Sequence, residues 1–222
     1  MGKAFTLSKK WSDMKKAAFI QSTYIPWKGN FDLIRSVDEF ILYDDAQYTK
    51  RDWRNRNRIK TRSGPLWLTI PVDIKGNSFQ PIKDIRVARG DWAETHWKAI
   101  RYHYGQAGSW RDAAGCVERM YRCAGSFAFL SEINLYIIKA ICEYLCIKTR
   151  ITTSMDYTFD RSGTPSKKLF DLCKAVGAEE YTSGPSARDY LEVGLFEQSG
   201  IAVRFFEYPA YPVYQQLFQP FE

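Results

Sequence analysis

Two adjacent carboxylates, Asp44 and Asp45, follow the apolar run Glu39–Tyr43 and are well placed to take up a proton. Carboxylates at the end of a strand can act as a base, orient an amine or bind a metal ion. A capped, solvated strand end explains the spacing equally well. Gln47 and Tyr48 follow closely and add polar groups that could contact a substrate. We take Asp44 and Asp45 as catalytic candidates.

The densest positive charge lies in Lys50–Arg62, whose sequence is KRDWRNRNRIKTR. Basic residues alternate there with asparagine, isoleucine and threonine, and a period of two predicts an extended segment with one basic face. Arginine grips phosphate in a bidentate manner, asparagine can bond a sugar or base edge, and indole can stack. A solvated edge strand is the alternative. The residues predicted to contact an anionic substrate are Arg51, Trp53, Asn55, Arg56 and Asn57.

The net charge of +7 is confined to the first 62 residues, which hold 14 basic and 7 acidic residues. The remaining 18 basic and 18 acidic residues cancel. A local basic cluster favours an anionic ligand over general attraction to a polyanion.

The first predicted strand, Lys16–Gln21, runs into a turn that precedes a helix. We expect Pro26 to keep Ile25 extended and Gly29 to let backbone N–H groups approach a ligand. Apolar residues at helical spacing follow from Phe31, so strand, turn and helix could form an anion cradle. The residues predicted to contact substrate in this stretch are Gln21, Tyr24, Trp27 and Gly29.

Other polar candidates lie farther along the chain. The predicted helix Asp91–Tyr104 carries both histidines, seven residues apart and so on nearly one face. His96 is a catalytic candidate, although two structural histidines are equally compatible with this spacing. The loop after the predicted strand Glu180–Thr182 adds three substrate-binding candidates, Ser183, Gly184 and Tyr190.

The order of elements predicts an α/β fold with three layers, a largely parallel sheet and a helical insertion. Ligands bind such sheets outside the carboxyl ends of the strands. We expect one domain over residues 17–222, after a disordered or vector-derived segment 1–16. Its parts are a site-bearing region 17–72, a helical region 91–146 and a βαβ region 147–222. Further predicted elements are strands Leu66–Val72, Lys148–Thr153 and Ile201–Phe206, a loop Asp73–Gly90, and helices Ser109–Cys123, Phe127–Cys146, Pro165–Val176 and Ala187–Gln198.

Composition also indicates the cellular setting. The five cysteines are odd in number and lack paired metal spacing, so we interpret them as thiols of a reducing cytosol and predict no metal site. No apolar run approaches the roughly 18–20 residues that span a bilayer, and the N-terminus lacks the apolar centre of a secretory signal. We therefore expect a cytoplasmic protein with no membrane insertion.

The motifs taken together resemble those of the WbqC-like family of bacterial polysaccharide gene clusters. The segments that carry the resemblance are IQSTYIPWKGNFDLI, DDAQYTKRDWRNRNRI, WLTIPV, EEYTSGPSARDYL and YPVYQQLF. The resemblance implies a transferase of O-antigen and lipopolysaccharide biosynthesis, proposed to transfer glycine to an amino sugar. Two positions depart from the usual pattern, with Ser22 in place of a proline and Asn30 in place of an aromatic residue. The residues carried over are Gln21, Pro26, Trp27, Gly29, Asp44, Asp45, Gln47, Tyr48, Asn55, Arg56, Asn57, Ser183, Gly184 and Tyr190.

A second resemblance concerns architecture. Pro-Trp-Lys-Gly-Asn after the first strand is similar in position to the His-x-Gly-His signature of nucleotidylyltransferase-like ligases such as pantothenate synthetase. Both histidines are absent here. The resemblance implies a Rossmann-like sheet and suggests an ATP-dependent amide-forming ligase, or another nucleotidylyltransferase-like enzyme, as an alternative function.

We therefore expect an enzyme that transfers a glycyl or related acyl group to the amine of a nucleotide-linked amino sugar. The basic segment would bind the diphosphate, and Asp44 or Asp45 would accept a proton from the attacking ammonium. An acyl-CoA, an aminoacyl-tRNA, or ATP plus an amino acid could serve as donor, and the cofactor is left open. A charged tRNA is the only nucleic acid expected as a partner of the enzyme. A non-catalytic RNA-binding module is the alternative from another class. The sugar, the nucleotide, the oligomeric state, a metal requirement and any extension past Glu222 are left open.

Overall fold

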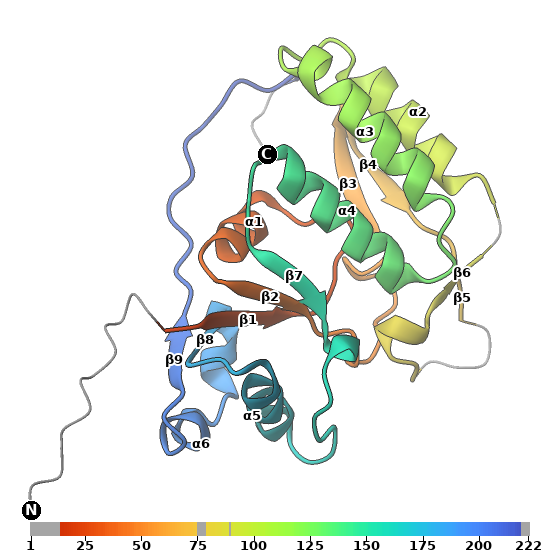
Figure 1. Ribbon diagram of the computed structural model, residues 1–222. Coiled ribbons are helices and arrows are strands. Elements are labelled where there is room, and N and C mark those ends of the chain that lie inside the picture. Colours follow the sequence, from red (N-terminus) through yellow and green to blue (C-terminus); the bar gives the residue numbers. More distant parts are fainter. Residues whose placement is uncertain (1–13, 75–78, 89, 219–222) are drawn as a thin grey trace, which may run out of the picture.

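The computed structural model describes residues 14–74, 79–88 and 90–218, so most of the segment 1–16 lies outside the described residues. A five-stranded sheet forms the centre of the molecule, and all its neighbouring strands are parallel (Figure 1). The spatial order is β7-β2-β1-β8-β9. The strands are β1 (Lys16–Ile20), β2 (Glu39–Leu42), β7 (Arg150–Thr153), β8 (Glu180–Ser183) and β9 (Ala202–Phe205).

The sheet is wound in two directions from its centre. Counted along the chain, its strands lie in the order 3-2-1-4-5, as in Rossmann-type sheets. The chain proceeds from β1 to β2 and β7, and then crosses to the other side of β1 to form β8 and β9. The topological switch point therefore lies between β1 and β8, where a ligand is expected at the carboxyl ends.

Helices cover both faces of the sheet because its side chains alternate in direction. On β1, Ala17 and Phe19 pack against α5 (Pro165–Val176) and α6 (Val193–Glu197). Ala18 on the other face packs in a cluster with α1 (Lys28–Arg35) and α4 (Leu130–Tyr144). The predicted three-layer α/β architecture is confirmed.

A second core lies on the far side of α4. It packs the hairpin of β3 (Arg56–Thr61) and β4 (Gly64–Thr69) against α2 (Trp92–Tyr104) and α3 (Trp110–Ala124). This second core contains the predicted helical insertion. The basic segment contributes strand β3 to it. The remaining short elements are β5 (Val72–Asp73), η2 (Ile82–Asp84), β6 (Arg86–Val87), η3 (Ser154–Asp156) and η4 (Pro185–Asp189).

Three predicted elements differ from the structure. The predicted strand Leu66–Val72 is confirmed in part by β4, but it does not join the central sheet, because the tight turn before Gly64 (φ 112°) pairs β4 antiparallel with β3. A parallel partner would need a crossover of about a dozen residues. The predicted helix Ala187–Gln198 is split into η4 and the short α6, and the predicted loop Asp73–Gly90 contains η2 and β6.

Candidate functional site

A cavity of about 780 Å³ opens at the topological switch point, where β1 and β8 end side by side. We call it the switch-point cavity. Its floor includes the ends of these strands, and the first turn of α5 forms one wall. Its size lies within the range of small-molecule sites. Its polar and charged lining residues are Gln21, Tyr43, Asp45, Gln47, Arg54, Lys168, Tyr181, Ser183, Ser186 and Tyr190.

Two cations of this cavity come from different segments of the chain. The Arg54 guanidinium donates to the carbonyl oxygens of Gln21 (3.4 Å) and Ser22 (3.3 Å), which ties the basic segment to the end of β1. Lys168 extends from the first turn of α5, and its side-chain ammonium makes no hydrogen bond or ion pair within the described part of the chain. A lysine there opposes the helix dipole, so its position favours a role in binding an anion.

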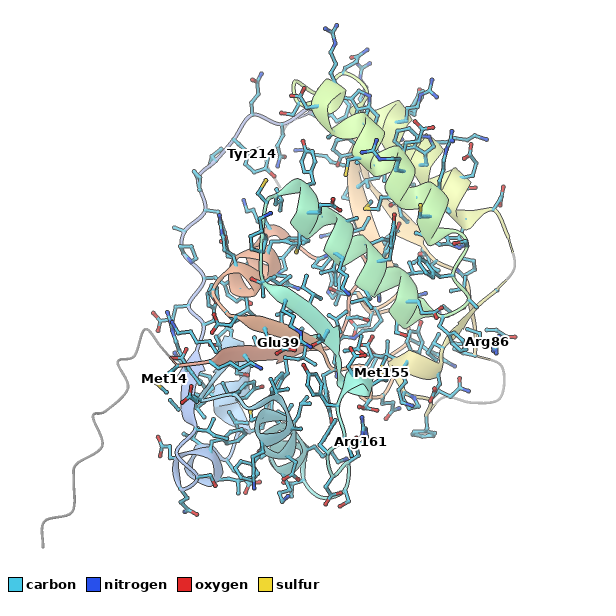
Figure 2. The ribbon with its side chains drawn as sticks, viewed as in Figure 1. Met14, Glu39, Arg86, Met155, Arg161 and Tyr214 are labelled. Carbon is cyan, nitrogen blue, oxygen red and sulfur yellow. The ribbon has the colours of Figure 1, made fainter. Side chains whose placement is uncertain are left out.

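Asp45 is the carboxylate of the switch-point cavity. Its side chain is 10% exposed, and its Oδ2 lies 3.1 Å from Nε of Arg161. Arg161 is itself fixed by donation to the carbonyl oxygens of Ser154 (2.8 Å) and Tyr157 (3.2 Å). Figure 2 places Arg161 on the chain between η3 and α5. This partner positions the Asp45 carboxylate at the cavity wall.

Asp44 lies behind the wall and is fully buried. Burial raises its pKa to about 6, against the opposing effects of the Ser22 N–H and of Arg54. Its Oδ1 accepts the backbone N–H of Ser22 at 2.8 Å. Asn134 donates to Ser22 Oγ and to the Arg54 carbonyl, both at 3.0 Å. Asp44 therefore positions the residues beside the cavity and does not line it.

A second cavity, of about 830 Å³, lies between the β1–α1 loop, the β3 strand and the C-terminal segment. We call it the aromatic cavity. The C-terminal segment leaves β9, passes α1 and reaches the turn between α2 and α3 (Figure 1). Figure 2 shows Tyr214 on this segment, well separated from Arg161. Its aromatic, polar and charged lining residues are Thr23, Trp27, Asn30, Trp53, Asn57, Arg58, Lys60, Tyr104, Tyr214, Gln215, Gln216 and Phe218.

The predicted site residues are thus divided between two cavities. Neighbouring residues of the same two segments line the two cavities. Gln21 and Arg54 line the switch-point cavity, and Thr23 and Trp53 line the aromatic cavity. The switch-point cavity contains Gln21, Asp45, Gln47, Ser183, Gly184 and Tyr190. The aromatic cavity contains Trp27, Trp53 and Asn57. The roles of these residues stay predictions.

Three candidates are buried in the second core, away from both cavities. His96 is 5% exposed, its Nδ1 lies 2.8 Å from the Tyr24 hydroxyl, and burial lowers its pKa to about 4. It is therefore neutral near pH 7 and reaches no substrate. Tyr24 also bonds Tyr121 at 2.6 Å, and Tyr48 packs in the same cluster. We assign these residues to the core.

The other candidates outside the cavities have structural contacts as well. Asn55 is buried and donates to the Ile70 carbonyl at 2.8 Å. Arg56 stacks on Trp67, 4.2 Å from the ring centre, and donates to the carbonyl of Arg51. The arginine that shares a cavity with Asp45 is therefore Arg54.

The β1–α1 loop differs from the prediction at two positions. Ile25 has φ 48° and is not extended, and the Asn57 amide donates to its carbonyl oxygen and to that of Tyr24. Gly29 is buried beneath the Trp27 indole, and a Cβ there would lie 2.4 Å from that ring. The glycine is needed for close packing of Trp27.

We expect Gly29→Ala to destabilise the protein, although glycine-to-alanine changes inside helices usually stabilise by about 0.5–1 kcal/mol. The new Cβ forces the Trp27 indole to move. Gly115→Ala is the matched control, because its Cβ in α3 would meet only Arg119 Nη1 at 3.5 Å. Denaturant unfolding measures both. A gain of similar size in both variants would show that Trp27 does not require a glycine.

The fold and the site together describe an α/β protein with a cavity of small-molecule size at the switch point of a doubly wound sheet. The sequence profile of the WbqC-like protein family matches residues 21–222, so the chain belongs to this family. The resemblance found in the sequence is confirmed.

One relative covers most of the chain. It is "Uncharacterized protein Rv1507c" of Mycobacterium tuberculosis, 46% identical over 209 residues, which span 94% of this chain and 89% of the relative. Shorter matches include the "Golgi to ER traffic protein 4 homolog" of Homo sapiens, 27% identical over 75 residues, 34% of this chain and 22% of that protein. No solved structure matches the chain.

Other predictions were tested in part. The cysteines of the chain are free thiols, and two of them, Cys142 and Cys173, are buried. Within the described residues, no helix is long and apolar enough to cross a bilayer. A cytoplasmic location stays a prediction.

Proposed function

We propose that this protein transfers a glycyl or related acyl group to the amine of a nucleotide-linked amino sugar in surface polysaccharide biosynthesis. One observation carries the proposal: Asp45, Arg54 and Lys168 line a single cavity at the switch point. A carboxylate suits an amine, and two cations suit a diphosphate, so the cavity matches both charged parts of such a substrate.

The chemistry begins with the amine in its ammonium form. Asp45 accepts one proton, because only the free amine is a nucleophile. The nitrogen lone pair attacks the acyl carbonyl, the C–N bond forms, and the bond from the acyl carbon to the leaving group breaks. The second amine proton leaves with the departing thiolate of CoA or alkoxide of tRNA, which becomes a thiol or hydroxyl. With ATP and an amino acid, the carboxylate first displaces pyrophosphate to give an aminoacyl adenylate, and AMP is then the leaving group while the second proton passes to solvent. The products are an amide and the deacylated donor.

A substitution of Lys168 tests directly whether the switch-point cavity binds the phosphates. Removing its charge as Lys168→Gln should weaken binding of a uridine or deoxythymidine diphosphate amino sugar by about 10- to 100-fold, the effect of losing a hydrogen bond to a charged group. Isothermal titration calorimetry with a panel of these compounds measures the affinity.

Lys174→Gln is the matched control for Lys168→Gln. It removes the same charge from the exposed side of the same helix, away from the cavity. Its affinity should equal that of the wild type. If both variants lose affinity equally, Lys168 acts only through the overall charge of the protein. If Lys168→Gln binds the ligand as tightly as the wild type, Lys168 does not contact the phosphates.

A further inference from the structure

The aromatic cavity has ring surfaces that the proposed acceptor site does not use. Trp27 is 50% exposed and Trp53 is 44% exposed, and both line this cavity together with Tyr104. Large aromatic side chains contribute most to stability when they are fully buried. Half-exposed indoles on a cavity wall therefore leave ring surface for stacking on a planar ligand.

The charge of this cavity has one sign. Arg58 and Lys60 line it from β3, and none of its described lining residues is acidic. The Arg58 guanidinium lies 5.9 Å from the centre of the Trp53 ring, so cation and stacking surface are neighbours. Lys60 Nζ donates to Gln216 Oε1 at 2.8 Å, which places the second cation beside the C-terminal segment. The cavity thus favours an anion that carries a planar ring.

Uncharged polar groups in the cavity suit the edge of such a ring. The Asn30 side chain is partly buried and makes no hydrogen bond within the described residues. A side-chain amide can bond N6 and N7 of adenine at the same time. Thr23 adds a hydroxyl group nearby.

We propose that the aromatic cavity binds the adenosine phosphate part of the acyl donor. This inference rests on the proposed function. The three donors left open by the sequence are an acyl-CoA, an aminoacyl-tRNA, and ATP with an amino acid. All of them contain adenosine and at least one phosphate, so the same stacking and cationic groups can bind any of the three.

The two cavities are arranged for transfer between two ligands. Each has a volume that suits one small-molecule ligand. Trp53 and Arg54 are adjacent in the chain and face different cavities. Consecutive Cα atoms lie about 3.8 Å apart, so the two cavities approach each other at these two residues.

The test measures binding of three probes to the full chain. They are CoA, ATP and a short RNA hairpin that ends in an unpaired CCA. Trp53→Leu should weaken the bound probe about 5- to 150-fold, the range for loss of one stacked base. Tyr144→Leu is the control, because this aromatic ring is 47% exposed and lines neither cavity, whereas the Trp67 ring lies 5.6 Å from that of Trp53. It should change affinity by less than about threefold.

A second pair of variants tests the contribution of the positive charge. Arg58→Gln should weaken the same probe, whereas Arg62→Gln on the same hairpin, exposed and outside both cavities, should not. The probe that binds in this pattern identifies the donor class. Failure of all three probes to bind, or equal effects of Trp53→Leu and Tyr144→Leu, would overturn the inference.

Parallel titrations with the nucleotide sugar separate this inference from the proposed function. If the nucleotide sugar binds in a Lys168-dependent manner and no probe does, the inference fails and the acceptor site stands. If Trp53→Leu abolishes nucleotide-sugar binding alone, the aromatic cavity belongs to the acceptor and the inference is overturned. If a probe binds with the expected pattern and no nucleotide sugar does, the adenosine site stands and the proposed function fails.

Discussion

Asp45→Asn is expected to lower the rate of acyl transfer by about 10²–10⁴-fold, the usual contribution of a general base. Asparagine has the shape of aspartate and cannot take the ammonium proton. The nucleotide-sugar affinity should fall by no more than about tenfold, because asparagine can still accept a hydrogen bond from the amine and the phosphates contact Arg54 and Lys168 in our proposal. Mass spectrometry of the amino sugar measures turnover when glycyl-CoA, glycyl-tRNA, and glycine with ATP are supplied together.

Asp84→Asn is the control for Asp45→Asn. It makes the same change at a carboxylate that is half-exposed, pairs with Lys83 at 3.5 Å and lies outside both cavities. Its turnover should equal that of the wild type. If Asp45→Asn retains most of the wild-type rate, Asp45 is not the base and the chemistry proposed for the switch-point cavity is wrong.

Asp44→Asn is expected to stabilise the protein increasingly as pH rises. Burial raises the folded pKa of Asp44 from 3.8 to about 6, so ionising it costs the folded state more than the unfolded state. The penalty is absent below the unfolded pKa and complete above the folded pKa. At about 1.4 kcal/mol for each pKa unit, the full penalty is about 3 kcal/mol. Asparagine avoids it and can still accept the Ser22 N–H.

Denaturant unfolding of both proteins checks this pH dependence. The free energy of unfolding of Asp44→Asn, relative to wild type, should rise by about 2 kcal/mol between about pH 4.5 and about pH 7.5. The exposed control Asp84→Asn should vary by less than about 0.5 kcal/mol. A difference that stays level, or that falls with pH, would show that Asp44 is not a buried carboxylate of raised pKa.

The sequence predicted the layers of the fold because periodicity records burial directly. Ala17 and Phe19 pack against the helices on one face of the sheet, and Ala18 packs against those on the other face. The spacing of Leu169, Leu172 and Val176 places them on one face of α5. It did not predict that Leu66–Val72 leaves the sheet. An apolar run has the same composition in a hairpin and in a central strand, and only the tight turn at Gly64 distinguishes them.

The candidate site could be predicted only in part. The positions of Gln21, Asp45 and Ser183 at the ends of predicted strands indicated that they lie together, because parallel strands bring their carboxyl ends to one edge of the sheet. Lys168 and Arg161 were missed, since each comes from a segment remote in sequence from β1 and β2. The lysine opposed to the helix dipole was the available signal. Tyr24 and His96 were misjudged because polar aromatic side chains can satisfy one another inside a core.

A crystal structure of the protein with a bound nucleotide-linked amino sugar would show where the acceptor substrate binds. We predict that the sugar amine lies within hydrogen-bonding distance of Asp45 and that the phosphates contact Arg54 and Lys168, at the carboxyl ends of β1 and β8. A ligand bound elsewhere, with the switch-point cavity holding only solvent, would contradict the account.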